Sequence, residues 1–238
     1  MEAPMIPDGE ARDPAPMAPD AAGQAEVMAT LTRAVEAVGR VLSPDTEVVL
    51  HDLSKIPNSL VAISGTVTGR KVGDPITDFL LRKLTDPHSP DHQSYRTTLP
   101  DGRELISHTT LFRDASGRAI AALCSNVDTT RWRAVKEAVG FFTGAAEAPP
   151  AVVEVAESEG FPHDLDELRT TILDDAIRRV AVPVDLMQKR HKLQVVADLR
   201  DSGFFTLRDA VPSAAQALEV SRFTVYNYLK QLDPQGDD

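Results

Sequence analysis

The stretch Ser213–Lys230, SAAQALEVSRFTVYNYLK, decides the fold of the last third of this 238-residue chain. Read as two short helices joined by a tight turn, it places the small side chains of Ala214 and Ala215 inward, where they let another helix come close. The second helix has an inward stripe at i, i+3, i+4 and i+7, made of Val225, Tyr228, Leu229 and Leu232. Inward and outward positions agree along the whole stretch, which favours a helix-turn-helix.

The outward face of the second helix is polar and aromatic. Ser221 is suited to cap this helix, because its hydroxyl can accept a free backbone N–H. Arginine can donate two hydrogen bonds to guanine and asparagine can pair with adenine, whereas serine, threonine and lysine hold phosphates. We predict that the helix at 221–232 enters the major groove of double-stranded DNA, with contacts from Ser221, Arg222, Phe223, Thr224, Tyr226, Asn227 and Lys230. The alternative is an ordinary helical hairpin with a solvated polar face.

Two features oppose DNA binding. Glu219 stands in the turn where such motifs usually have glycine, and a left-handed glutamate costs about 1 kcal/mol. The chain also has a formal net charge of −11, and duplex DNA repels an acidic protein. However, residues 187–232 contain seven basic and four acidic residues, so the acidity lies elsewhere. The terminal segment is therefore compatible with a phosphate backbone.

The rest of the terminal domain, which we place at 164–234, is also predicted to be helical. Apolar periodicity predicts helices over 165–180 and 185–201, and Gly203 is placed to end the second of these in a left-handed conformation. The next helix should begin between Asp209 and Ser213. The missing N–H of Pro212 then falls among the donors that a helix leaves free.

The amino-terminal part has a different pattern. Residues 1–23 contain five prolines and few large apolar side chains, so we expect a disordered tail. A helix should follow, because five apolar residues step by three and four: Met28, Leu31, Val35, Val38 and Leu42. This stripe faces either the core of the domain or a second copy of the chain.

Short β-rich runs occupy the region from Thr46 to Asp128: TEVVLHDLS, SLVAISGTVTG, RELISHTTLFRD and RAIAALCSNVD. Between the second and third runs, DPITDFLLRKLTD has helical spacing. This order predicts one antiparallel sheet with helices on one face, an α+β domain over 24–142 that ends in a helix over 129–142. The acidic, proline-bearing stretch at 143–163 is interpreted as a linker to the all-α domain.

Several classes of function are disfavoured. No run of about 18 apolar residues could span a membrane, and the amino terminus lacks the pattern of a secretion signal. A single cysteine, Cys124, cannot form an internal disulfide, so we expect a cytoplasmic protein. Cys124 lacks a nucleophile motif, the histidines are scattered, and GTVTGRKVG lacks the order of a phosphate-binding loop. We therefore predict no catalytic residue, no metal site and no cofactor.

Polar residues on or beside the predicted strands favour a pocket for a small molecule. Inward polar groups on a half-buried sheet are costly unless paired, so they either contact a ligand or pair with one another. The candidate ligand-binding residues are His51, Asp52, Arg70, Asp74, Cys124, Asn126 and Asp128. Alternation places Cys124, Asn126 and Asp128 on one face of their strand, and it leaves open which face is inside.

Over about residues 26–232 the chain resembles the YheO-like PAS-domain transcriptional regulators. The motifs that carry the resemblance are EVVLHDLS, TGRKVGDPITD, DGRELISHTTLFRDASGR, ALCSNVD and VSRFTVYNYL. The resemblance implies a PAS-like sensor followed by a DNA-binding domain, and local control of transcription. Some relatives are linked to amino-acid use, including that of D-arginine, which implies an amino-acid-like metabolite as effector.

Together these features predict a ligand-responsive transcriptional regulator, a repressor that binds DNA half-sites as a homodimer. Two other classes stay open. The helical domain could bind a partner protein, which would make the chain an adaptor, or the sensor domain could be an enzyme.

Overall fold

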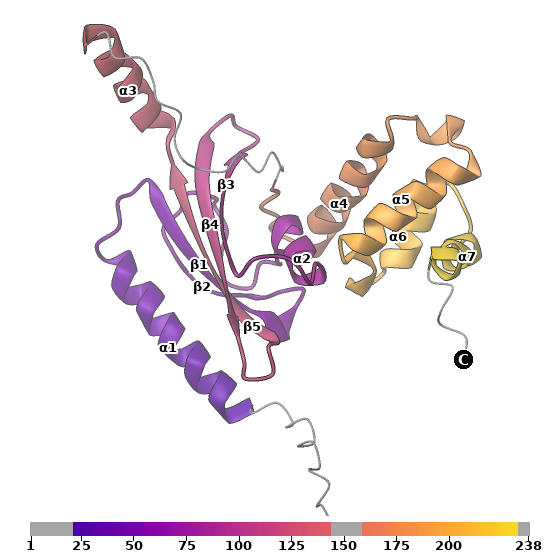
Figure 1. The fold of residues 1–238 in the computed structure, drawn as a ribbon, viewed down its shortest axis with the longest axis horizontal. Coiled ribbons are helices and arrows are strands. Elements are labelled where there is room, and N and C mark those ends of the chain that lie inside the picture. The colour runs from indigo at the N-terminus through magenta and orange to yellow at the C-terminus, as the bar shows by residue number, and fades with distance from the viewer. Residues whose placement is uncertain (1–20, 144–158, 233–238) are drawn as a thin grey trace, which may run out of the picture.

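The computed structural model describes residues 21–143 and 159–232, which form a sheet domain and a helical domain (Figure 1). Residues 1–20 of the predicted tail and 144–158 of the predicted linker lie outside the described residues. None of the helices within the two described ranges is long and apolar enough to cross a membrane.

The sheet domain contains five antiparallel strands in the order β2-β1-β5-β4-β3. The strands are β1 (Thr46–Asp52), β2 (Leu60–Ser64), β3 (His92–Thr98), β4 (Glu104–Arg113) and β5 (Ala119–Asp128). The predicted antiparallel sheet is confirmed, but β3 was missed by the sequence analysis. Only Tyr95 and Thr97 of this edge strand are buried. Its sequence, HQSYRTT, therefore lacks the apolar alternation that marks a half-buried strand.

Helices cover both faces of the sheet, so the prediction of helices on one face is wrong. Helix α1 (Ala21–Gly39) packs on β1 and β2, where Val35 joins Val48 and Leu50 in one apolar cluster. Val49 points the other way, into the cluster that includes Leu80 of α2 (Asp78–Thr85). The physical reason is visible in β1: six of its seven residues are buried, so it is a central strand covered on both sides.

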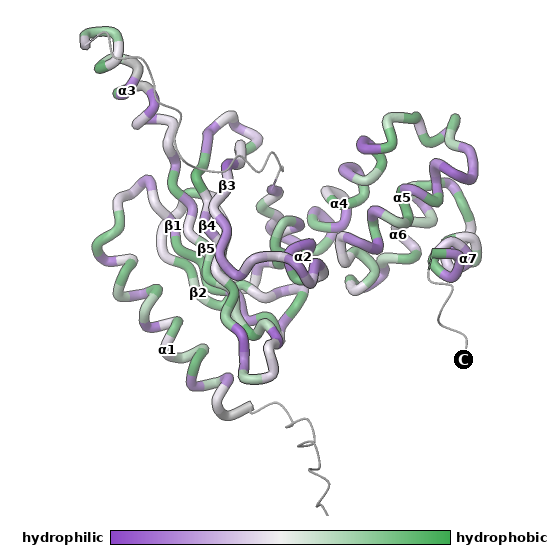
Figure 2. Tube along the Cα trace, viewed as in Figure 1, coloured by the Kyte–Doolittle hydropathy of each residue, from purple (hydrophilic) through white to green (hydrophobic). Residues whose placement is uncertain are grey.

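The apolar stripe of α1 faces the core for most of its length. Val35 is 2% exposed, and Met28, Leu31 and Leu42 pack partly buried beside it. Val38 is 45% exposed, because it lies at the edge of a shallow apolar groove of about 160 Å³ between α1 and the outer face of the sheet. Figure 2 shows the alternation of hydrophobic and hydrophilic residues along this helix.

Helix α3 (Thr130–Thr143) continues from β5 and projects away from the rest of the molecule (Figure 1). Its large apolar side chains are exposed: Trp132 by 61%, Val135 by 56%, Val139 by 54% and Phe142 by 85%. So many exposed apolar side chains on one helix are unusual for the surface of a monomeric protein.

The helical domain contains α4 (Leu165–Val180), α5 (Lys189–Asp201), α6 (Ala210–Ala217) and α7 (Arg222–Leu232). Short 3-10 turns lie at Val184–Leu186 and Phe204–Thr206, and another at Leu53–Lys55 follows β1. The predicted helix from residue 185 starts four residues later, at Lys189, because the first of these turns precedes it.

Two backbone predictions for the helical domain are confirmed. Gly203 is left-handed, with φ of 76°, two residues after α5 ends. Pro212 is the third residue of α6, within the first turn, where its missing N–H breaks no helical hydrogen bond.

The two domains pack against each other through α2. Leu80 and Leu81 belong to the same apolar cluster as Leu168 of α4, and the Thr85 hydroxyl donates to the Asp201 carbonyl at 2.8 Å. A Cβ on Gly203 would lie 2.8 Å from the Thr85 side chain. The close approach explains why this position needs glycine in addition to its left-handed backbone.

Candidate DNA-binding surface and buried polar cluster

Helices α6 and α7 form a helix-turn-helix around a tightly bonded turn. The N–H of Val220 donates to the Ala215 carbonyl at 2.9 Å, and the Lys192 ammonium donates to the Leu218 carbonyl at 2.7 Å. Glu219 is left-handed, with φ of 51°, the conformation that costs a glutamate about 1 kcal/mol. Lys192 offsets part of the resulting strain, because a cation at the carboxyl end of a helix is stabilising.

The amino terminus of α7 is capped by a side chain. The N–H of Thr224 donates to the Ser221 hydroxyl at 3.1 Å, and the two hydroxyls lie 2.9 Å apart. The predicted capping role of Ser221 is therefore confirmed. The cap fixes where the first turn of α7 begins, and hence which way its next residues point.

Opposite faces of α7 have opposite surroundings. Val225 is fully buried and Tyr228 is 7% exposed, in one apolar cluster with Leu218 of the preceding turn. On the other side Phe223 is 73% and Tyr226 is 59% exposed. Among the other predicted DNA-contacting residues, Thr224 is half-buried. The remaining four are exposed: Ser221, Arg222, Asn227 and Lys230. A helix anchored on one side thus presents polar and aromatic side chains on the other.

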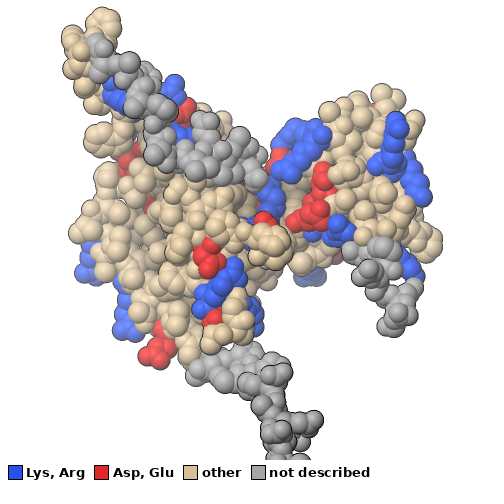
Figure 3. All heavy atoms as spheres, in the orientation of Figure 1, with Lys and Arg blue, Asp and Glu red and all other residues tan. Residues whose placement is uncertain are grey.

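The surroundings of α7 include further basic side chains. Lys189 and Arg190 are exposed in the first turn of α5, and Arg200 donates to the Leu232 carbonyl at the end of α7 at 3.2 Å. Figure 3 shows Lys and Arg side chains on the outer rim of the helical domain. This distribution favours contact with a polyanion despite the acidic total.

The inner face of the sheet, which α2 covers, carries a buried polar cluster. It is formed by side chains that are at most about a tenth exposed and that come from four strands and two loops: Glu47, His51, Arg70, Tyr95, Thr97, Ser107, Thr109, Cys124, Asn126 and Glu159. The sequence left open which face of β5 is inside. Cys124 and Asn126 both point into the cluster, so the face that carries them is the inner one.

Hydrogen bonds run across the strands of the cluster. The Ser107 hydroxyl donates to the side-chain oxygen Oδ1 of Asn126 at 2.9 Å, and the side-chain N–H of Asn126 donates to the Glu47 carboxylate at 3.2 Å. Glu47 also accepts from the backbone and hydroxyl of Thr68, at 3.0 and 2.7 Å. The Thr109 hydroxyl lies 3.4 Å from the Cys124 sulfur. Much of the cluster is thus internally paired, as the alternative to ligand contact predicted.

Arg70 and Glu159 are the exceptions. Arg70 is 6% exposed, and its guanidinium donates to the Pro75 carbonyl, yet its Nε has no hydrogen-bond partner. Glu159 is 7% exposed, and its Oε2 also has none. Burial and the neighbouring Asp78 carboxylate raise the pKa of Glu159 to about 7. Burial lowers the pKa of Arg70, and Glu159 is the charge that opposes this shift most.

The other candidate ligand residues differ in their surroundings. His51 is hydrogen-bonded to Ser59 at 2.8 Å, and burial lowers its pKa well below 6.5, so the ring is neutral. Asp74 accepts from the Lys71 N–H at 3.0 Å and lies 3.4 Å from His163. Asp52 caps the 3-10 turn after β1 by accepting from the Ser54 N–H at 3.1 Å. Asp52 is thus engaged outside the cluster.

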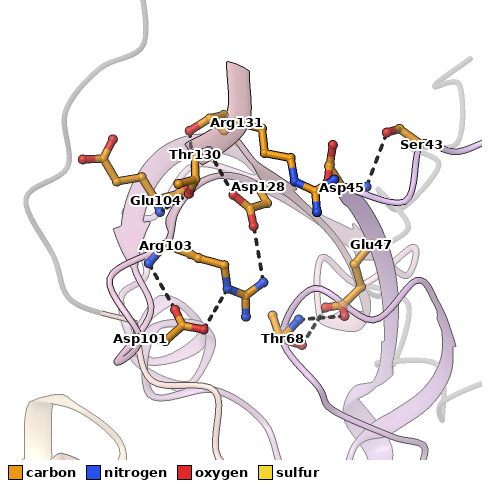
Figure 4. A network of polar contacts seen from close by, with 11 residues as sticks. Ser43, Asp45, Glu47, Thr68, Asp101, Arg103, Glu104, Asp128, Thr130 and Arg131 are labelled. Atoms are coloured by element: carbon orange, nitrogen blue, oxygen red, sulfur yellow. Dashed lines mark hydrogen bonds and ion pairs between the residues drawn. The ribbon is translucent and has the colours of Figure 1, made fainter. Parts of the chain in front are cut away.

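Asp128 lies at the end of β5, where α3 begins (Figure 4). Its carboxylate accepts from the Thr130 N–H at 2.9 Å and from Arg103 at 3.3 Å, and Arg103 also binds Asp101 at 2.8 Å. These contacts hold the root of α3 against the β3–β4 turn. Asp128 therefore anchors a helix, and we exclude it from the candidate ligand site.

The chemistry of a nucleophilic enzyme or a metal centre has little support here. Burial raises the pKa of the Cys124 thiol to about 12, so the thiolate that would attack a substrate does not form near neutral pH. Among the residues that the structure describes, no group of three or more His, Cys, Asp or Glu side chains could hold a metal ion.

The sequence analysis missed six of the ten residues of the polar cluster, including Glu47 on β1. Tyr95 and Thr97 lie on the unpredicted β3, and Glu159 lies in the stretch that was interpreted as a linker. Ser107 and Thr109 could have been found, because they alternate with Ile106 and His108 along a predicted strand and share the face of Leu105 and Leu111.

Comparison with known proteins agrees with this architecture. A family model described as a YheO-like PAS domain matches residues 22–144, and one described as an HTH domain matches residues 168–230. The Escherichia coli protein YheO is 29% identical over 220 residues, covering 90% of this chain and 89% of that protein. The Pseudomonas aeruginosa protein named Transcriptional regulator DauR is 28% identical over 204 residues, covering 85% and 92%.

Among solved structures, an RNA-binding light-oxygen-voltage receptor matches 60% of this chain and 42% of its own, with 17% identity and a TM-score of 0.29, a similarity too low to bear on function. The two family models instead account for both domains, in the same order as the sheet and the helix-turn-helix. The chain therefore belongs to the family of proteins that have a YheO-like PAS domain followed by a helix-turn-helix domain.

Proposed function

We propose that this protein is a ligand-responsive transcriptional regulator that binds double-stranded DNA through α7. The observation that carries the proposal is the two-sided character of α7, whose inner side is locked in the core while Arg222, Tyr226 and Asn227 are exposed. The relative that is named a transcriptional regulator, DauR, supports it.

Each side chain on the outer face of α7 has a chemical role in this proposal. Arg222 would donate two hydrogen bonds to a guanine and Asn227 would pair with an adenine, because these are the matching edges in the major groove. Ser221, Thr224 and Lys230 would contact phosphates, and Phe223 and Tyr226 would contact sugars or thymine methyl groups. The eleven residues of α7 are about 16 Å long, enough to cross the groove.

We propose that the protein acts as a homodimer through α3. Trp132, Val135, Val139 and Phe142 are exposed and are spaced by three, four and three residues, which is the a/d spacing of a coiled coil. A second copy would cover this stripe, and two copies of α7 could then read half-sites about one helical turn apart.

The sensor domain would bind the effector, a small amino-acid-like metabolite, at its buried polar cluster. Arg70 supports this role, because a buried guanidinium with an unpartnered Nε can still donate to an anionic group. We propose repression as the mode of control, since it requires only that the protein occupy a DNA site. A regulator of genomic DNA would work in the cytoplasm.

The test is selection of bound genomic fragments by the purified full chain, followed by measurement of affinity for the selected site. Arg222→Ala should lower that affinity by roughly 1–3 kcal/mol and relax base choice at one position. Arg179→Ala is the matched control, because Arg179 is exposed on α4 and far from the turn in sequence. Equal affinity of wild type and Arg222→Ala on every DNA would show that Arg222 does not read bases, and failure to select any DNA fragment would favour the adaptor.

A further inference from the structure

The segment Glu159–His163, here called the linker strap, leads into the helical domain but is bonded to the sensor domain. The Glu159 N–H donates to the Thr97 hydroxyl at 3.3 Å, and the Gly160 N–H donates to the Asp78 carboxylate at 2.8 Å. These contacts join residues 62 and 82 positions apart in the chain. The strap is therefore a tertiary element of the sensor.

The rest of the linker strap is also held by the sensor domain. Phe161 packs against the apolar cluster of Val67, Leu99 and Leu105. Pro162 is buried, and His163 approaches Asp74 at 3.4 Å. Four of the five residues of the strap, Glu159, Gly160, Phe161 and His163, thus contact the sensor domain.

Glu159 puts a carboxylate into the buried polar cluster that also contains the opposite charge of Arg70, and the two charges interact. An arginine fork has five N–H donors and matches a carboxylate with two parallel hydrogen bonds. Here Arg70 Nε and Glu159 Oε2 are both buried and both lack a hydrogen-bond partner, although the two charges interact. The cluster thus contains one N–H of Arg70 and one carboxylate oxygen of Glu159 whose hydrogen-bonding capacity is unused, although Thr77 and Tyr95 hydrogen-bond to the Glu159 carboxyl.

A buried carboxylate with one unpaired oxygen is costly, because its hydrogen bonds from Thr77 and Tyr95 replace only part of its water. A free small-molecule carboxylate can orient itself on the guanidinium, whereas Glu159 is restricted by the backbone of the strap. Binding of such a ligand would also return the Glu159 carboxylate to water, where its charge is hydrated. Both effects favour exchange of the strap for a ligand.

We propose that Glu159 occupies the anion subsite of the sensor, and that the ligand of this subsite is a carboxylate-bearing small molecule that binds Arg70 and displaces the linker strap. The proposal rests on the proposed function only in that the sensor binds an effector. Strap release needs no covalent step, and it changes the segment that leads directly into α4.

The test replaces the strap's carboxylate by a free one. Glu159→Ala should leave a carboxylate-sized space beside Arg70, and sodium acetate is the probe for it. In this variant, acetate should raise the unfolding temperature relative to chloride at equal ionic strength and neutral pH. Its apparent affinity should be about tenfold or more above that for wild type, where Glu159 competes. Asp174→Ala, which removes an exposed carboxylate of α4, is the control and should respond as wild type does.

A second substitution tests the partner. Arg70→Lys in the Glu159→Ala background keeps the positive charge but loses the fork, so the acetate response should be strongly reduced. If Glu159→Ala does not fold, Glu159→Ser gives a smaller loss of packing and the same space. Hydrogen exchange of residues 159–163 should be faster in either variant than in wild type.

Equal responses to acetate and chloride in a folded Glu159→Ala protein would overturn the proposal, as would an acetate response that Arg70→Lys leaves intact. Either result would make the linker strap a permanent structural plug. DNA affinity is not used as a readout. Failure of DNA binding would therefore count against the proposed function alone, and failure of the acetate response against the strap alone.

Discussion

Burial of Glu159 predicts that the protein loses stability as the pH rises from mildly acidic to neutral values. The carboxyl has a pKa of about 7 in the folded protein, against an ordinary value of 4.5, with burial as the main cause. A group whose pKa is raised on folding binds more protons in the folded state. Its stabilising contribution is therefore complete below about pH 4.5 and is lost as the pH rises through about 7.

The size of the effect follows from the shift. Each pKa unit corresponds to about 1.4 kcal/mol, so the free energy of unfolding should fall by roughly 2–3 kcal/mol between pH 5 and pH 8 from this group alone. Glu159 is 7% exposed, so solvent screens it little. Asp78 titrates in the same direction and His51 in the opposite one, because burial raises the pKa of the first and lowers that of the second.

Glu159→Gln isolates the contribution of this one carboxyl, since the amide has nearly the same shape and does not titrate. Urea unfolding of both proteins at a series of pH values between 5 and 8 gives the two stability curves. The wild-type curve should fall relative to that of Glu159→Gln, most steeply between about pH 5 and pH 6.5, and should level off above about pH 7. Parallel curves would mean that the carboxylate is hydrated at neutral pH, and the burial argument would be wrong.

Three further substitutions test other parts of the structure. Leu218→Ala should lower the free energy of unfolding by about 2–5 kcal/mol in urea titrations, because Leu218 is fully buried between α6 and α7, whereas Leu186→Ala, at an exposed site, should change it by less than about 0.5 kcal/mol. Glu219→Gly should raise the free energy of unfolding, measured by thermal denaturation, by up to about 1 kcal/mol, since glycine adopts the left-handed turn without strain. A lower free energy of unfolding would show that the Glu219 side chain stabilises the turn. Val139→Asp should dissociate the dimer in sedimentation experiments, and unchanged sedimentation of a dimer would place the interface away from α3.

The helix-turn-helix could be predicted from the sequence because its determinants are local. The buried stripe of α7, the cap at Ser221 and the left-handed Glu219 all lie within about a dozen residues, and each follows from helix geometry or backbone sterics. No contact with a distant part of the chain was needed to place them. The unusual glutamate in the turn was recognised for the same reason.

The sensor was less predictable because its arrangement depends on distant contacts. Edge strand β3 is polar by composition, and only its pairing with β4 makes it a strand. Whether Val49 or Leu50 faces α1 depends on which helix packs on which face, and nothing in the local pattern of β1 decides this. Glu159 stands in an acidic, proline-bearing stretch, and nothing in that stretch indicates that its carboxylate is buried. Its hydrogen-bond partner Thr97 is 62 residues away in the chain.

The position of the linker strap indicates how an effector could reach the DNA-binding surface. Asp164, the residue after the strap, caps α4 by accepting the Glu167 N–H at 2.8 Å. A displaced strap must either pull this cap away, at a cost of about 1 kcal/mol, or move α4 with it. Because α4 shares an apolar cluster with Leu81 of α2, a movement of α4 requires the side chains at that contact to re-pack. The two domains do not need to separate. Coupling of 1–3 kcal/mol between effector and DNA, a 5- to 150-fold change in affinity, needs no larger rearrangement than this.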